Sequence, residues 1–147
     1  MTEAAFCTVI AATLLLAHPS SAADDSYQVG KTDARLNVGS KGKASVTISA
    51  KKGWHINAEA PLTLKLLPTT GVTLDKVKFG RGDLALSNET MARFDVVLTA
   101  AEPGKMAVEA EAAFVLCQED SCRPIKEKFT LAVDATAPTA ASGKRRK

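Results

Sequence analysis

Cys117 and Cys122 are the residues of this chain whose type and spacing could do chemistry. Four polar residues separate them, and a strand-like, largely apolar run flanks each side. The pattern predicts a β-hairpin with a thiol at each end of its loop. Thiols placed so closely can form a disulfide without large movement of the backbone. Such a bridge is either a structural staple or a redox couple.

The residues around the pair leave both interpretations open. Closing a loop of about six residues should stabilise a fold by only about 2 kcal/mol, so stability alone is a poor reason for the bridge. Local disulfides in exported hairpins are nevertheless common and inert. The neighbouring charges do not decide, because Arg123 and Lys126 favour a thiolate whereas Glu119 and Asp120 oppose it.

Trp54 and His55 form a second group of interest. Trp54 is the only tryptophan, and His55 is the only histidine after residue 23. We expect the indole to fill the core and the imidazole to hydrogen-bond a loop rather than to act in catalysis. His55, Cys117 and Cys122 could supply three metal ligands, but no second pair at zinc spacing accompanies them. We therefore expect no metal and no other cofactor, and we interpret Arg81-Gly82-Asp83 as a charged turn.

Residues 1–23 have the order of a secretory signal peptide. An apolar run over 6–17 is followed by small residues and then by Asp24, which predicts cleavage after Ala22 or Ala23. The run is too short to span a bilayer comfortably. The mature protein would be periplasmic or secreted. Removal of Cys7 with the leader would leave two cysteines, which are expected to pair in an oxidising compartment.

Charge separates the folded part from the C-terminal end. Four of the 19 Lys and Arg residues lie in 144–147, and one of the 16 acidic residues, Glu3, lies in the leader. Residues 24–143 therefore carry 15 of each sign, which argues against a nucleic-acid-binding face. Residues 135–147, rich in Ala, Thr, Pro and Ser before their basic end, are typical of a disordered tail.

Residues 24–134 are expected to form one all-β domain. Apolar and polar residues alternate along about seven or eight short segments separated by turn signals, and no helical stripe interrupts them. We interpret 84–91 as a loop. The pattern predicts an immunoglobulin-like antiparallel β-sandwich, with a small closed barrel as the alternative.

The stretch Lys52–Asn57, then Pro61-Leu62, then Cys117-x4-Cys122 with Pro124 just after, carries a family likeness. Over about residues 30–134 the chain resembles the N-terminal periplasmic domain of the thiol:disulfide interchange protein family DsbD. The resemblance implies an immunoglobulin-like fold whose cysteine pair passes electrons by thiol–disulfide exchange. It also implies that Cys122 is the attacking thiol and Cys117 the resolving one.

The leading hypothesis is therefore an exported thiol–disulfide exchange module, a component of a protein-disulfide reductase system. The resemblance implies thioredoxin-like or disulfide isomerase-like partners, and a membrane electron transporter is a further candidate. Family members continue into membrane and thioredoxin-like domains, so the electron donor here is expected to be a separate protein. No small-molecule ligand is predicted. The rival hypothesis is a non-catalytic binding or assembly module with a structural disulfide.

Overall fold

Strands account for most of residues 25–138, the part of the chain that the computed structural model describes. The expected signal peptide at 1–23 lies outside the described residues. Within them the only helical element is the 3-10 turn η1 (Arg81–Asp83), and no helix is long and apolar enough to cross a bilayer. The all-β class predicted from the sequence is confirmed.

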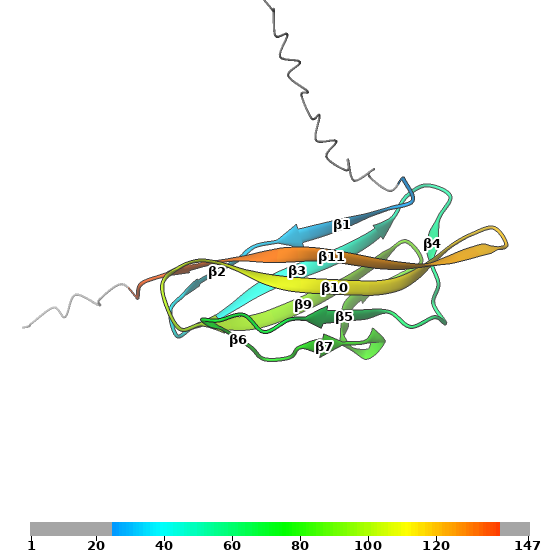
Figure 1. Cartoon of the computed structure of the whole chain (residues 1–147). Coiled ribbons are helices and arrows are strands. Elements are labelled where there is room, and N and C mark those ends of the chain that lie inside the picture. The colour runs from blue at the N-terminus through cyan, green and yellow to red at the C-terminus, as the bar shows by residue number, and fades with distance from the viewer. Residues whose placement is uncertain (1–24, 139–147) are drawn as a thin grey trace, which may run out of the picture.

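Two sheets lie face to face (Figure 1). In the first, the strand order is β1 (Tyr27–Thr32), β3 (Lys41–Ala50), β9 (Met91–Ala100) and β6 (Val72–Leu74), with β8 (Leu84–Ser87) also paired to β9. In the second, the order is β2 (Ala34–Asn37), β11 (Ser121–Thr136), β10 (Gly104–Gln118), β5 (Thr63–Leu66) and β7 (Lys78–Phe79), with β4 (His55–Ile56) also paired to β10. All pairings are antiparallel except that of β2 with β11. The arrangement is a sandwich, not the closed barrel considered as an alternative.

The core follows from the two-residue period of the strands. Every second residue is buried from Gly42 to Ile48 on β3 and from Ala92 to Ala100 on β9, and the intervening Ser, Thr, Asp and Arg side chains face outward. Phe94 on β9 is fully buried and meets Phe79 edge-to-face, with the ring centroids 6.0 Å apart. The inner face of β10 contributes Val108, Ala110, Ala112, Phe114 and Leu116.

Two expectations about the strands need correction. Residues 84–87, expected to be loop, form strand β8 against β9. A shift in register between Leu84 and Leu86 disturbs the alternation and so hides this strand from a pattern of period two. The eleven strands within residues 25–138 exceed the expected seven or eight partly because β4 and β7 have only two residues each.

The domain expected from the sequence ends at residue 134, which is before the end of its last strand. β11 continues to Thr136, two residues beyond 134, because β2 pairs with it in parallel over Val133–Thr136. The Val38 amide donates to the Thr136 carbonyl at 2.9 Å, and Ala135 is only 3% exposed. Composition alone could not reveal this pairing with a strand one hundred residues earlier.

Gly42 on β3 marks a close contact between the two sheets. A Cβ atom there would lie 2.8 Å from Leu36 Cδ2 and 2.9 Å from Leu36 Cβ. We expect Gly42→Ala to lower the free energy of unfolding by about 2 kcal/mol through overpacking, measured by denaturant titration. Gly30→Ala on β1 is the matched control, because its nearest neighbour, Thr47, would be 3.8 Å away. Equal stabilities of the two variants would contradict this account.

Candidate functional site: the Cys117–Cys122 disulfide

Cys117 and Cys122 are bonded to each other, near the tip of the hairpin formed by β10 and β11. In Figure 1 this tip extends beyond the rest of the sandwich. The predicted loop of four residues is shorter in the structure, because Gln118 pairs with Ser121 and only Glu119 and Asp120 make the turn. Glu119 has a φ of 51°, which lies in the left-handed region that such tight turns require.

The disulfide connects residues directly opposite each other in the ladder. Cys117 pairs with Cys122, and their Cα atoms are 4.0 Å apart. In a two-residue hairpin the pair beside the turn is hydrogen-bonded, so the next pair, that of the cysteines, is non-hydrogen-bonded, the closer kind. All fifteen residues of β10 pair with β11, so the ladder fixes this register without the bridge.

The two sulfur-bearing residues differ in exposure. Cys117 is 2% exposed, whereas Cys122 is exposed. The difference follows from the neighbours of each strand, because His55 of β4 lies opposite Cys117 on one flank of β10. No strand among residues 25–138 covers the corresponding flank of β11 at Cys122. A reagent in solution therefore meets Cys122 first.

Asn57 contacts the buried sulfur. Its Nδ2 lies 3.5 Å from Cys117 Sγ and donates to it. Its Oδ1 accepts hydrogen bonds from the amides of Glu59 at 2.8 Å and Ala60 at 3.0 Å. Since two backbone donors require an oxygen at that position, they fix the amide with its NH2 toward the sulfur. The side chain is therefore oriented to stabilise negative charge on Cys117.

Arg81 holds the loop that carries Asn57. Its Nε donates to the Ala60 carbonyl at 2.7 Å, and its Nη2 donates to the Asn57 carbonyl. The Arg81-Gly82-Asp83 segment, interpreted from the sequence as a charged turn, thus supports the surroundings of the disulfide. Nothing in the local sequence could have indicated this, because the contact spans 24 residues.

Asp83 holds the 3-10 turn η1, which contains Arg81. Hydrogen bonds from Lys76 Nζ at 2.5 Å and from the Gly80 amide at 2.8 Å hold the pKa of Asp83 below its usual value. The stabilisation is therefore fully present above the usual carboxyl pKa and is lost as the pH falls through the lowered value. We expect Asp83→Asn to be less stable than wild type at neutral pH, with the difference shrinking in acid. Thermal unfolding at several pH values measures this, and a difference that grows in acid would contradict it.

Trp54 and His55 occupy different environments. Trp54 is half-buried and packs against the core, in part as predicted, and the Arg123 guanidinium lies 4.9 Å from its ring centroid. Arg123 also donates to the buried Ser26 hydroxyl. His55 is exposed. Within residues 25–138 no cluster of three or more His, Cys, Asp or Glu side chains could hold a metal, and the sulfurs of Cys117 and Cys122 are bonded to each other.

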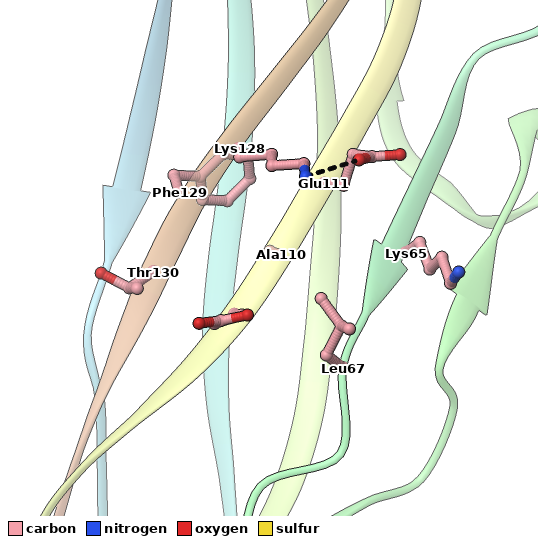
Figure 2. Close-up of a pocket in the computed structure, with 8 residues that line it drawn as sticks. Lys65, Leu67, Ala110, Glu111, Lys128, Phe129 and Thr130 are labelled. Atoms are coloured by element: carbon pink, nitrogen blue, oxygen red, sulfur yellow. Dashed lines mark ion pairs between the residues drawn. The ribbon is translucent and has the colours of Figure 1, made fainter.

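Two cavities lie along the β10 and β11 ladder. Figure 2 shows the larger, of about 600 Å³, whose lining includes Lys65, Leu67, Glu111 and Lys128. Lys128 Nζ lies 3.9 Å from Glu111 Oε2. Opposite charges are mixed there, and no cysteine or histidine lines it. The other, of about 390 Å³, is mostly apolar and includes Val115 and Pro124, the pair that follows the cysteines on the same face.

Comparison with family models and with curated proteins gave no match. Among solved structures, PapD-like domain 7 of human CEP192 has a TM-score of 0.39 at 12% identity, over 88% of this chain and 99% of that one. A protein of unknown function from Porphyromonas gingivalis W83 has a TM-score of 0.42 at 12% identity, over 79% of this chain and 50% of that one. AggA, the major fimbrial subunit from Escherichia coli, has a TM-score of 0.39 at 12% identity, over 78% and 98% respectively. TM-scores this low establish neither a common fold nor a common function, so the sandwich rests on the strand pairing itself.

Proposed function

We propose that this chain is an exported thiol–disulfide exchange module whose reactive centre is the Cys117–Cys122 pair. The observation that carries the proposal is the difference in exposure of the two cysteines, 2% for Cys117 against an exposed Cys122. Exchange needs one sulfur that a partner can reach and a second that stays close to resolve the intermediate. The resemblance to the N-terminal domain of DsbD supports the same assignment of roles.

Reduction of the pair begins at the exposed sulfur. A partner thiolate attacks Cys122 Sγ, the Cys117–Cys122 bond breaks, and Cys117 leaves as a thiolate while the partner and Cys122 form a mixed disulfide. A second partner thiolate then attacks its own neighbouring sulfur and releases Cys122. The partner dithiol is oxidised, and the pair gains two electrons. Asn57 Nδ2 lies where the charge on Cys117 develops, so its hydrogen bond stabilises the leaving thiolate.

Oxidation of the pair is the reverse sequence with a client disulfide. The Cys122 thiolate attacks a client sulfur and expels the other client sulfur as a thiolate. The Cys117 thiolate then attacks Cys122 Sγ, which restores the Cys117–Cys122 bond and releases the client as a dithiol. The Cα separation of 4.0 Å keeps the resolving sulfur within reach of the mixed disulfide. No cofactor takes part, because the electrons stay on sulfur throughout.

The proposal includes the setting and the partners of the pair. The chain acts after export, with the leader cleaved behind Ala22 or Ala23, in the periplasm or outside the cell. Its electron donor is a thioredoxin-like protein or a membrane electron transporter, and its clients are disulfide isomerase-like proteins. The support for these partners is the resemblance to DsbD together with the exposed edge of the hairpin.

A redox titration against thiol buffers tests the function. We expect the pair to have a reduction potential above about −300 mV, the region below which structural disulfides of secreted proteins usually lie. Thiol trapping in the native compartment should find part of the pair reduced. A potential well below that value, with full oxidation in cells, would instead support a structural staple. In that case Cys117→Ala/Cys122→Ala would cost about 2 kcal/mol of stability and no activity.

A further inference from the structure

Strand β11 has an open edge beside the exposed cysteine. β10 pairs with β11 along one side, and β2 pairs with the other side only over Val133–Thr136. Within residues 25–138, no strand pairs with that other side between Ser121 and Ala132, although β1 of the facing sheet contacts β11 where Lys31 meets Thr130. The side chains of Cys122, Pro124, Lys126 and Lys128 along this stretch are all exposed.

The ladder decides which backbone groups point to the open edge. In an antiparallel pair, residues at non-hydrogen-bonded positions direct both backbone groups away from the partner strand. Cys122 occupies such a position, and so do the even-numbered residues after it. The carbonyls of Thr130 and Thr136 confirm the direction, since they accept from Lys31 Nζ at 3.1 Å and from the Val38 amide at 2.9 Å. The open edge therefore offers the amides of Cys122, Lys126 and Lys128 and the carbonyls of these residues and of Pro124.

The chemistry of exchange requires approach from this edge. A thiolate displaces sulfur along the line of the breaking bond, on the side opposite to the leaving sulfur. The leaving sulfur belongs to Cys117 on β10 and the attacked sulfur to Cys122 on β11. The incoming sulfur must therefore come from beyond β11, across its open edge, so the residues that flank the partner's cysteine lie alongside that edge.

The charges along the edge select the kind of segment that fits. Lys126 and Lys128 are both exposed, and Lys31 of β1 reaches the same edge at Thr130. Lys128 lies 3.9 Å from Glu111, and no carboxylate among the described residues forms an ion pair with Lys126. If the partner's cysteine lies opposite Cys122, the partner residue four positions away lies opposite Lys126. An acidic side chain at that position would be attracted to Lys126 and Lys128.

We propose that the edge of β11 from Cys122 to Lys128 binds an extended, acidic segment of the redox partner as an added strand, with the partner's cysteine facing Cys122. The inference rests on the proposed function and names how that site recognises its partner. Strand addition gives affinity through backbone bonds and specificity through side chains. Pro124 lacks an amide at this edge, and the lysines repel a second copy, so the edge resists pairing with itself.

Synthetic peptides with one cysteine activated as its thionitrobenzoate disulfide provide the test. They would react with the mature Cys117→Ser chain, and release of thionitrobenzoate would be followed by absorbance. Two versions of each peptide would be N-methylated at alternate amides. In the first version the blocked amides point to β11, and in the second they point away from it. We expect the first version to react about tenfold more slowly than the second, since two lost backbone bonds cost about that factor. The acidic peptide should also outpace a basic one, with the difference reduced in high salt.

A pair of protein variants provides the independent measurement. Lys126→Pro removes an amide that faces the open edge and not β10, whereas Lys126→Ala removes the same charge and keeps that amide. The proline variant should react with the unmethylated peptide about threefold more slowly than the alanine variant, because one backbone bond is lost instead of two. Both should react equally with the small reagent dithionitrobenzoate, which makes no strand contacts.

The outcomes separate the inference from the function beneath it. If both methylated peptides react alike while dithionitrobenzoate reacts normally, strand addition is wrong and the exchange function stands. If the chain forms a dimer that Lys126→Pro dissociates, the edge binds a second copy and not an acidic partner. If Cys117→Ser fails to react even with dithionitrobenzoate, the proposed function itself is wrong.

Discussion

Cys117→Ser should accumulate mixed disulfides through Cys122, whereas Cys122→Ser should react about a hundredfold more slowly with the same disulfide reagents. The reason is the exposure of the remaining thiol, since Cys122 is open to solvent and Cys117 is 2% exposed. A buried thiol reacts only when the structure opens locally, and an opening that costs about 3 kcal/mol imposes roughly this factor. Mass spectrometry of the trapped adducts and the rate of thionitrobenzoate release provide the measurement.

The comparison contains its own control for stability. Both serine variants lose the same disulfide, worth about 2 kcal/mol in the chain-entropy account, and Cys117→Ser also buries a hydroxyl, so it should be the less stable of the two. Because an exposed thiol reacts without opening of the fold, this difference in stability does not account for the faster reaction of Cys122. Equal reactivity of the two variants would contradict the assignment of Cys122 as the attacking sulfur.

Asn57→Asp should slow reduction of the disulfide by a small dithiol about tenfold to a hundredfold, the range expected for losing a hydrogen bond to a charged group. The aspartate keeps the oxygen that accepts from the amides of Glu59 and Ala60, so the loop should stay in place. It removes the Nδ2 donor from Cys117 Sγ and adds a like charge beside the leaving thiolate. The rate with dithiothreitol, followed at constant pH, measures the effect.

Asn88→Asp is the matched control for this substitution. Asn88 Oδ1 accepts from the amides of Thr90 at 3.0 Å and Met91 at 2.8 Å, the same arrangement as at Asn57, but its side chain has no contact with the sulfur. Its reduction rate should equal that of wild type. If both variants slow the reaction equally, the effect of Asn57→Asp is one of net charge, and the hydrogen bond to Cys117 plays no part in exchange.

Much of the fold could be predicted because its signals are local. Alternation of period two marks β3 and β9, whose inward residues are buried from Gly42 to Ile48 and from Ala92 to Ala100. The polar residues around Glu119 mark the hairpin turn. The parallel pairing of β2 with the end of β11 could not be predicted in this way. It depends on two segments about one hundred residues apart, and neither of them signals it alone.

The same distinction applies to the site. The cysteine pair is visible as a spacing in the sequence, but the difference between its members is not, because polar residues lie beside both. The difference arises from tertiary structure, where β4 lies beside β10 at Cys117. Asn57 and Arg81 act through contacts across 60 and 24 residues, so no local pattern could give them a role.

The path of β11 separates the disulfide from the far end of the domain. Cys122 and Thr136 lie near opposite ends of one continuous strand, β11. Figure 1 shows this strand running along the length of the sandwich. Fourteen residues at a strand's rise per residue span about 45 Å. A partner bound around Thr136 would therefore not block a second partner at Cys122. A contact that holds the domain at the Thr136 end thus leaves the disulfide at the other end accessible.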